Sequence, residues 1–547
     1  MCVIYQELIE ILKKKRLTEK QLYQLKRELC KKYKVKKIPT NIEILLHASP
    51  EDIGRLGLIA KPVRTISGVA VVAVMSYPFS CRHGKCIMCP GGPASVFGDV
   101  PQSYTGNEPA TMRAIRNKYD AYMQVFNRLE HYYSMGHIPE KVELIVMGGT
   151  FPSFPKKYRE DFITNCFKAM NDFSQLFFRK NKFDFVKFKK FFELPGDIYD
   201  KARGKSIEKK MLKLKRKSSL EREQLRNEKS RIKCVGLTIE TRADYGKLKE
   251  GKEMLRLGCT RAEVGVQSVY DKALKNIQRG HSVKAVIECF QILKDLGFKI
   301  NAHYMLGLPG VSEKEDLEGL RELFRNPDFR PDMLKIYPCM VIQGTKLYDL
   351  WKKGKYKAIT TKKAAEILIE FKKNVPEYLR IMRVQRDIPT KIAAAGVDMN
   401  NLRQYVQQIM KKKGLKCRCI RCREVKASKA GEPEIIIRDY EASKGKEFFI
   451  SAEADDKILG FCRLRFPSDT RSSALIRELH VYGPAAGVGR KGEVQHKGIG
   501  KNLLMTAEQI CKKAGKNKIL VISGVGVRGY YRKLGYKREG PYMVRTI

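Results

Sequence analysis

Residues 81–92 read CRHGKCIMCPGG and bring three cysteines, Cys81, Cys86 and Cys89, within nine positions. They follow the apolar run at residues 68–75, which we predict to be a buried strand. Thiolates are soft ligands that bind zinc, copper(I) and iron–sulfur clusters. Three close thiols without a local fourth ligand favour a four-iron cluster with one iron open to another ligand. A zinc site that borrows a distant ligand and three metal-free buried thiols are the alternatives.

The overall composition bounds the class of protein. With 547 residues, of which 43% are hydrophobic, the chain is typical of a globular protein of two to four domains. No stretch approaches the roughly 18 consecutive apolar residues that span a bilayer, and the first residues lack a secretory-signal pattern. We therefore predict a cytoplasmic protein without a membrane partner. Its fifteen cysteines then indicate metal or redox chemistry more than disulfide bonds.

The charge balance indicates a polyanionic partner. Lysine and arginine number 108 against 59 acidic residues, which gives a formal net charge of +49. Nucleic acid is the favoured partner, because no amphipathic membrane anchor stands out. Residues 1–60 are predicted to form a small basic helical module. Residues 201–233 hold fourteen basic and four acidic side chains, and we predict an RNA-backbone clamp that becomes ordered only when bound, the alternative being a mobile solvated loop.

From about residue 60 the pattern changes to short apolar stretches that alternate with helical ones. Such alternation predicts parallel βα units, and six of them predict an α/β fold of the partial (βα)6, TIM-like type. The active site of such a barrel lies at the carboxyl ends of its strands. The six predicted strands are residues 68–75, 142–147, 234–239, 262–266, 299–305 and 333–337.

Residues with special chemistry follow these strands in phase. Glycine and proline commonly end strands, so any one of these signals is weak, but their recurrence at successive strand ends indicates a site. The cysteine triad follows the first strand, and Gly148, Gly149 and Thr150 follow the second. Glu240 and Arg242 follow the third strand, Gln267 follows the fourth, and the glycine-proline run at 307–310 follows the fifth.

The C-terminal part has a different pattern. A glycine-bearing loop, QHKGIG at 495–500, leads into a helical run at 501–514. Such a loop presents free backbone N–H groups and the positive end of the helix dipole, which suits a pyrophosphate. Four predicted strands precede the loop, at residues 434–437, 448–451, 459–464 and 474–481.

A second group of cysteines lies between the two parts. Cys417, Cys419 and Cys422 form a C-x-C-x-x-C pattern in a strongly basic stretch that starts at Lys411. This pattern is typical of a structural zinc site that takes its fourth ligand from elsewhere. The sequence does not identify that ligand, and Cys339 is a candidate by analogy only.

Combined, these features resemble a known enzyme family. The CxxxxCxxC triad, the glycine pair after the second strand and the six βα units are similar to radical S-adenosylmethionine (SAM) enzymes, although CxxxCxxC is their commonest spacing. With Cys-Pro-Gly-Gly at the triad and VAVMS before it, the chain resembles the catalytic subunit of the elongator complex, in an archaeal-like form. That family joins a radical-SAM domain to an α+β acetyltransferase domain of the GNAT type, whose Q/R-x-x-G-x-G/A loop binds coenzyme A.

The resemblance implies a function. The family modifies C5 of the wobble uridine (U34) of tRNA, building a carboxymethyl group from acetyl-CoA with a 5′-deoxyadenosyl radical derived from SAM. The implied partners are the tRNA anticodon stem-loop, acetyl-CoA and an electron donor, with the chain acting alone or as a homodimer and the need for elongator subunits left open. Two rival functions are a protein lysine acetyltransferase with structural cysteines and a non-catalytic tRNA-binding scaffold.

The resemblance also implies roles for individual residues. Cys81, Cys86 and Cys89 would hold a 4Fe-4S cluster. SAM or substrate contacts would come from Gly148, Gly149, Thr150, Glu240, Arg242 and Gln267. Coenzyme A contacts would come from Glu478, Leu479, His480, Val481, Gln495, His496, Lys497, Gly498, Ile499, Gly500, Tyr530 and Tyr531. The candidate catalytic residues are Lys335, Tyr337, Tyr530 and Tyr531. Candidates for phosphate contacts are Arg383, Arg386, Lys391 and Arg403.

We expect four parts in the chain. They are a basic tRNA-binding module at 1–60, a radical-SAM domain at 61–395 with a basic insertion at about 173–233, a cysteine-bearing linker at 396–430 and an acetyltransferase domain at 431–547. Because one RNA must meet both chemistries, we expect the coenzyme A site and the cluster to approach each other. The two large domains should then share a large interface.

Overall fold

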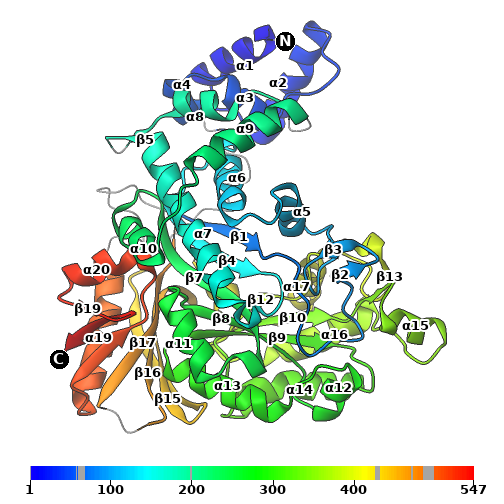
Figure 1. The fold of residues 1–547 in the computed structure, drawn as a ribbon, viewed down its shortest axis with the longest axis vertical. Helices are drawn as coiled ribbons and strands as arrows, with labels where there is room; N and C mark the ends of the chain where they lie inside the picture. The colour runs from blue at the N-terminus through cyan, green and yellow to red at the C-terminus, as the bar shows by residue number, and fades with distance from the viewer. Residues whose placement is uncertain are drawn as a thin grey trace.

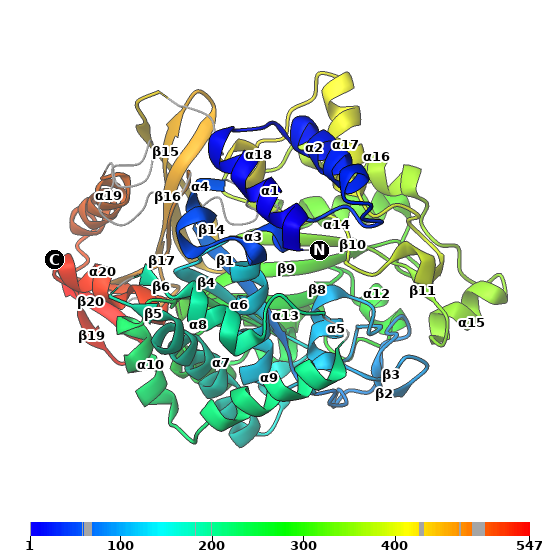
Figure 2. The ribbon, with the colours of Figure 1, turned by 90° about the horizontal axis from the view of Figure 1, so that it is seen from above.

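The computed structural model shows a central half-barrel of strands, a helical module at one end and a second sheet to one side (Figure 1, Figure 2). The structure describes residues 2–56, 58, 68–180, 182–197, 200–425, 431–469, 472–483 and 498–547. Within these ranges, none of the helices combines the length and the apolar character that a bilayer crossing requires.

The N-terminal module is helical, as predicted, and has a core of its own. Apolar side chains at helical spacing, among them Ile4, Leu8 and Ile44, bury one another there. Thr18 and Thr40 each begin a helix with a capping box, which satisfies backbone N–H groups of the first turn. The helices are α1 (Cys2–Lys14), α2 (Glu19–Lys32), α3 (Asn41–His47) and α4 (Pro50–Leu56).

Parallel strands form the half-barrel, in the order β1-β4-β7-β8-β9-β10-β12. The six predicted strands are present, and the predicted partial barrel is confirmed. The sequence pattern missed β12, because this short strand begins and ends with arginine and lacks an apolar run. The strands are β1 (Val69–Met75), β4 (Lys141–Met147), β7 (Lys233–Arg242), β8 (Arg261–Gln267), β9 (Lys299–Leu306), β10 (Met333–Pro338) and β12 (Arg380–Arg383).

Helices between the strands cover the outer face of this sheet and bury its apolar side chains. The longer ones are α6 (Ala121–Ser134), α7 (Lys156–Phe177), α11 (Leu248–Arg256), α13 (Val283–Asp295), α14 (Glu313–Arg325) and α16 (Thr361–Lys373). Smaller elements are α5 (Pro109–Arg116), α12 (Asp271–Asn276), α15 (Lys346–Lys352), α17 (Leu402–Lys412), α18 (Ile420–Arg423), β2 (Gly92–Ser95), β3 (Gly98–Val100), β11 (Val341–Ile342) and β13 (Ala393–Ala395).

The basic insertion is folded, so the prediction of a segment ordered only on binding is wrong for its described residues. Its phenylalanines pack on the end of α7; the rings of Phe177 and Phe188, for example, lie 5.5 Å apart. The Nζ of Lys189 donates to the carbonyl oxygen of Leu46 at 2.8 Å, which links the insertion to the N-terminal module. The prediction rested on the charge of this segment and overlooked its phenylalanines, which form a small aromatic core. The elements are β5 (Phe178–Arg179), β6 (Lys182–Phe183), α8 (Phe185–Phe192), α9 (Lys201–Leu214) and α10 (Leu220–Lys229).

The C-terminal domain is built on a second sheet, in the order β14-β15-β16-β17-β18-β20-β19. Its neighbours are antiparallel except β17 and β18, which pair in parallel from Ser473 to Ile476 only. The rest of β17 continues without β18 beside it. The elements are β14 (Glu434–Ala442), β15 (Gly445–Ala454), β16 (Lys457–Phe466), β17 (Ser473–Val481), α19 (Ile499–Lys513), β18 (Lys518–Val521), α20 (Arg528–Lys533), β19 (Lys537–Glu539) and β20 (Tyr542–Thr546).

Buried arginines join this domain to the half-barrel. Arg477 of β17 donates to both carboxylate oxygens of Asp332 at 2.5 and 2.9 Å, just before β10 begins. Arg465 of β16 pairs with Asp295 at the end of α13, with an N–O distance of 2.6 Å. Both arginines are completely buried. A buried charge is tolerated only when it is paired and hydrogen-bonded, so these pairs fix how the domains sit together.

Glycines bring the two backbones close at the same interface. The short turn η5 (Val525–Val527) lies against the start of β7. A Cβ at Gly524 would lie 2.1 Å from the carbonyl oxygen of Val235, and one at Gly526 would lie 2.9 Å from the amide nitrogen of Cys234. The expected interface between the two domains is therefore present.

Candidate active site

A cavity of about 220 Å³, the upper cavity, lies at the carboxyl ends of the barrel strands. The three cysteines of the first triad line it, together with most of the strand-end residues singled out in the sequence: Gly149, Thr150, Glu240, Arg242, Gln267, Lys335 and Tyr337. Gly148 lies beside it, because its amide nitrogen donates to the Oε2 of Glu240 at 3.2 Å. The structure thus brings these residues together, and their individual roles stay predictions.

The cysteine triad sits on the loop after β1, among polar groups. The Nε2 of His83 lies 3.4 Å from the Sγ of Cys86, and the amide nitrogen of Ser103 lies 3.2 Å from the Sγ of Cys89. Burial raises the pKa of the Cys81 thiol to about 11. A thiolate here therefore needs a neighbouring cation, as a metal centre provides.

The spacing of this triad is too wide for one ion. Its three sulfurs are not among the groups of described residues whose ligand atoms all lie within 4.8 Å of one another. Zn–S bonds of about 2.3 Å in a tetrahedron hold the sulfurs only about 3.8 Å apart. The wider arrangement fits a multinuclear centre such as an iron–sulfur cluster.

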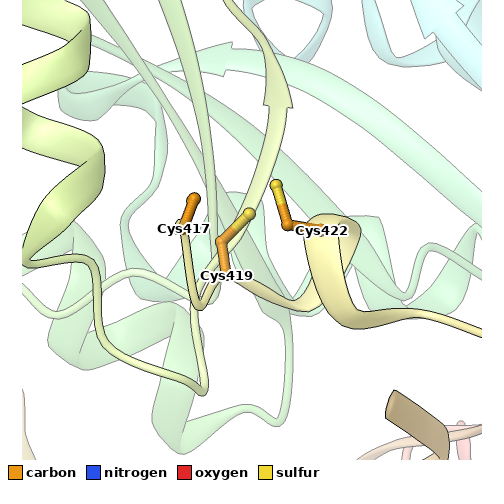
Figure 3. Close-up of side chains that lie close together, drawn as sticks. All are labelled: Cys417, Cys419 and Cys422. Atoms are coloured by element: carbon orange, nitrogen blue, oxygen red, sulfur yellow. The ribbon is translucent and has the colours of Figure 1, made fainter. Parts of the chain in front are cut away.

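The second triad has the opposite character. Cys417 and Cys419, on the loop before α18, lie close to Cys422 within α18 (Figure 3). Their sulfurs all lie within 4.8 Å of one another, which fits a single tetrahedral ion. Their immediate neighbour is Lys372, whose Nζ lies 3.2 Å from the Sγ of Cys417 and 3.8 Å from that of Cys422.

The suggestion that Cys339 completes this second site is wrong. That thiol is buried at the end of β10 in a separate apolar cluster, which includes Leu347 and Tyr356. Among the described residues, no further cysteine, histidine or acidic side chain joins the group of three. The analogy failed because β10 ends in the interior of the half-barrel, whereas α18 lies outside it.

Glu240 and Gly148 meet where β7 and β4 end. The hydroxyl of Tyr104 donates to the Oε1 of Glu240 at 3.2 Å. Burial, together with repulsion from Glu263, raises the pKa of the Glu240 carboxyl. Gly148 has a φ of +118°, and a Cβ there would lie 2.2 Å from the Oγ of Ser76. Only glycine fits this close, left-handed position.

Sequence reasoning missed the charged group at the centre of the cavity. Glu263 of β8 is buried, forms an ion pair with Lys335 and lies 3.0 Å from the Nε2 of His303. Burial alone would raise the pKa of Glu263, but Lys335 and His303 hold it well below its ordinary value. Burial and Lys335 lower the pKa of His303 to about 4, so this imidazole is neutral near pH 7. The signal was present in RAEVGVQ at 261–267, where every second residue is polar or glycine.

The four basic residues proposed for phosphate contacts separate into different settings. Arg383 and Arg386 line the upper cavity, and the Arg386 guanidinium lies 5.5 Å from the ring centre of Tyr104. Arg403 donates to the carbonyl oxygen of Ile381 at 3.0 Å and is half-buried. Lys391 is exposed. Arg383 and Arg386 therefore line the same cavity as the first cysteine triad, which the sequence did not predict.

A second cavity of about 930 Å³, the lower cavity, lies between the starts of the barrel strands and the C-terminal domain. Gly498, with a φ of +82°, precedes the first turn of α19 at its edge. Tyr530 is 40% exposed, whereas Tyr531 is only 7% exposed. Gln495, His496 and Lys497 lie outside the described residues. The remaining residues predicted to bind coenzyme A line this cavity: Glu478, Leu479, His480, Val481, Gly498, Ile499, Gly500, Tyr530 and Tyr531.

The two cavities lie at opposite ends of the same strands. A strand such as β4, with seven residues, spans about 20 Å. The coenzyme A residues and the first cysteine triad therefore lie at opposite ends of the strands, and the approach that we expected is limited to Val71, which lines both cavities. The reason is the docking of the second sheet, which binds through Asp332 and Asp295 to the end of the barrel where strands begin.

Comparisons with known proteins agree with this arrangement. Four family models match: the ELP3 N-terminal domain at residues 2–66, the radical SAM superfamily at 196–324, the radical SAM C-terminal domain at 331–412 and the GNAT acetyltransferase family at 417–536. The chain is 45% identical to the tRNA uridine(34) acetyltransferase of Methanocaldococcus infernus, covering 100% of this chain and 99% of that protein. It is 40% identical to Elongator complex protein 3 of Homo sapiens, covering 96% and 93%.

A solved structure is also similar. The Methanocaldococcus infernus Elp3, truncated at its N-terminus, superposes with a TM-score of 0.70 at 38% identity, over 88% of this chain and 100% of that one. The half-barrel matches the radical SAM fold and the second sheet matches the GNAT fold. With relatives above 40% identity along almost its whole length, the chain belongs to the Elp3 family.

Proposed function

We propose that this chain is an enzyme that carboxymethylates C5 of the wobble uridine (U34) of tRNA, with acetyl-CoA and SAM as co-substrates. Its membership of the Elp3 family supports the proposal, because two relatives carry the name tRNA uridine(34) acetyltransferase. One observation carries it: a cysteine-lined cavity and an acetyltransferase cavity occupy the two ends of a single half-barrel. Neither a plain acetyltransferase nor a scaffold requires both.

In this proposal the upper cavity holds the radical chemistry. Cys81, Cys86 and Cys89 would bind a 4Fe-4S cluster, which with SAM supplies one-electron chemistry at an unactivated carbon. Arg242 binds Asp244 through two hydrogen bonds of 2.9 Å, and its remaining nitrogen, Nη1, is buried without a partner among the described atoms. This free donor suits a carboxylate. SAM contacts would come from Gly148, Gly149, Thr150, Glu240, Arg242 and Gln267.

The charged groups of the upper cavity would have different roles in proton transfer. Glu240 has a raised pKa, whereas the neighbouring Glu263 has a lowered one. Such a split between two close carboxyls assigns proton donation to the first and a permanent negative charge to the second. Burial alone would lower the pKa of Lys335, but Glu263 raises it above its ordinary value. Lys335 would therefore act as a fixed ammonium donor that orients an oxygen of the substrate, with Tyr337 beside it.

The lower cavity would hold coenzyme A through α19, Tyr530 and Tyr531. On its far side the cavity is walled by the starts of barrel strands, including Arg261, Lys299 and Met333. A protein lysine acetyltransferase leaves that side open for a peptide. Barrel strands occupy that side here, which favours the tRNA reaction over the lysine reaction.

The remaining parts of the chain would serve the RNA and the fold. Exposed basic side chains on α9, among them Lys205, Lys209 and Lys213, would contact the phosphates of a tRNA, consistent with the net charge of +49. We propose that Cys417, Cys419 and Cys422 bind structural zinc in place of the contact with Lys372. We also assign the four parts of the chain as expected from the sequence, a cytoplasmic location and an external electron donor.

Mass spectrometry of wobble nucleosides tests the proposal. Cells that lack this protein should lose carboxymethyl-type uridines, and the wild-type gene should restore them. Unchanged wobble uridines together with a loss of acetyl-lysine would favour the lysine acetyltransferase. Unchanged nucleosides with retained tRNA binding would favour the scaffold.

A further inference from the structure

The interior of the half-barrel is open toward both cavities. Val71 lies in the middle of β1 and is 39% exposed, whereas its neighbours Ala70 and Val72 are completely buried. Side chains alternate along a strand, so Val71 faces the barrel interior while its neighbours face the covering helices. Val71 lines the lower cavity and also the upper one.

One layer of side chains separates the two cavities. Register places Val71 beside Glu143 and Thr238 beside Arg261, and these four residues line the lower cavity. Two residues of strand span about 7 Å, so this layer lies about that distance from the next inward-facing residues of the same strands. The next inward residues on the same strands all line the upper cavity: Ala73, Ile145, Glu240 and Glu263.

The Nε of Arg261 has no hydrogen-bond partner among the described atoms, although this residue is only 6% exposed and lines the lower cavity. A buried donor without a partner is destabilising. The layer is therefore suited to a guest that supplies an acceptor.

We propose that the barrel interior is the passage through which the acyl end of the coenzyme A donor reaches the upper cavity. This inference rests on the proposed function and names the route of its substrate. The pantetheine arm of coenzyme A is narrow, uncharged and carries two amides, whose C=O groups can accept a hydrogen bond from the Arg261 Nε. The thioester thus enters the upper cavity from the side of the strand starts, and the wobble base enters the same cavity from the carboxyl ends of the strands.

Covalent trapping tests the passage without requiring turnover. Ala73→Cys places a thiol in the wall of the upper cavity of the full-length, cluster-loaded protein, kept free of oxygen. Bromoacetyl-coenzyme A should alkylate this thiol with loss of bromide, and peptide mass mapping measures the rate. Adding Val71→Phe, which fills the layer, should slow this reaction at least tenfold, whereas the matched Val71→Ala should not. Bromoacetamide, which is small enough to enter from the upper mouth, should react at the same rate in all three proteins.

Other outcomes would overturn the inference. Equal alkylation by bromoacetyl-coenzyme A with and without Val71→Phe would mean that the arm enters from the upper mouth. Alkylation of Thr238→Cys but never of Ala73→Cys would mean that the arm stops at the layer. If Val71→Phe fails to fold, Thr238→Met fills the same layer and replaces it. Intact trapping in a protein that never forms carboxymethyluridine would refute the proposed function and leave the passage standing.

Discussion

The two ends of the half-barrel use buried charge in opposite ways. At the lower end, Arg477 and Arg465 each meet carboxylates of the barrel, so that the charges neutralise one another and hold two domains together. At the upper end, Glu263 and Lys335 pair within the cavity, while Glu240 is left with a raised pKa and only neutral donors. The same strands supply both ends, since Lys335 lies three residues after Asp332. The buried charges at the starts of the strands therefore fix how the two domains sit together. The charged groups toward the ends of the strands remain available for catalysis.

The largest effect should come from breaking the upper end alone. Cys86→Ala should abolish iron binding and lower carboxymethyluridine formation by more than about 100-fold, because a cluster ligand is removed. Iron analysis and nucleoside mass spectrometry measure the two losses. Coenzyme A binding by calorimetry should be unchanged, since the lower cavity is untouched. The matched Cys30→Ala, in the core of the N-terminal module, should keep its iron; full iron content in Cys86→Ala would contradict the assignment.

Breaking the lower end should instead cost stability. Asp332→Asn leaves Arg477 and Arg463 buried without their shared carboxylate, and such a change should lower the free energy of unfolding by about 3–5 kcal/mol. Urea unfolding followed by far-ultraviolet circular dichroism measures this free energy. Asp295→Asn should cost less, because the Asp295 side chain is 14% exposed, whereas that of Asp332 is fully buried. A loss below about 1 kcal/mol for Asp332→Asn would show that the domains are held by other contacts.

One glycine at each end gives a sharper contrast. Gly148→Ala brings a Cβ to 2.2 Å from the Ser76 Oγ, and Gly524→Ala brings one to 2.1 Å from the Val235 carbonyl oxygen. Each should cost about 1–3 kcal/mol, the first in SAM affinity and the second in stability and coenzyme A affinity. Gly529→Ala, whose Cβ meets no atom within 4 Å, is the control. Equal losses of both affinities in either variant would mean that the ends are not independent.

The pH dependence of stability should report on the upper end. Burial and Lys335 lower the pKa of His303 from 6.5 to about 4. Because the unfolded chain binds this proton below pH 6.5 and the folded chain only near pH 4, the stability that neutral His303 contributes is lost as pH falls through that window. His303→Gln should therefore gain up to about 2 kcal/mol relative to wild type between pH 7 and pH 5 in urea unfolding. A constant difference between the two proteins would mean that folding leaves the pKa of His303 unchanged.

The smallest effect should come from the surface that belongs to neither end. Lys209→Gln and Lys213→Gln each remove one exposed positive charge from α9. Each should weaken tRNA binding a few-fold and lower the slope of log K against log salt by roughly 0.7–0.9. Fluorescence anisotropy at several salt concentrations measures this. Lys357→Gln, an exposed lysine after α15, is the matched control; an equal change there would remove α9 as a specific RNA contact.

The upper end could be predicted from sequence because its signals are local. Parallel strands bring their carboxyl ends together, so Gly148, Glu240 and Gln267 could be grouped from their positions alone. Glu263 was missed because it lies in mid-strand, where an apolar run was expected, and only its period-two pattern with Arg261 marks it as inward-facing.

The lower end could not be predicted in the same way. Asp332 and Arg477 are 145 positions apart in sequence, and neither lies in a motif. Their pairing depends on how two independent sheets dock, which no local pattern encodes. The insertion was mispredicted for a related reason: its net charge indicated disorder, whereas its phenylalanines pack on α7, as Phe188 does on Phe173.

The central claim is that both ends serve one reaction, and carbon labelling tests it most directly. Oxygen-free, cluster-loaded protein is incubated with tRNA, SAM, a reductant and acetyl-CoA labelled with carbon-13 in the methyl group, and the wobble nucleosides are analysed by mass spectrometry. The account predicts label in the carboxymethyl group of U34, dependent on SAM and absent in Cys86→Ala. Label recovered only on protein lysines, or U34 left unmodified by protein that holds iron and binds both SAM and acetyl-CoA, would contradict it.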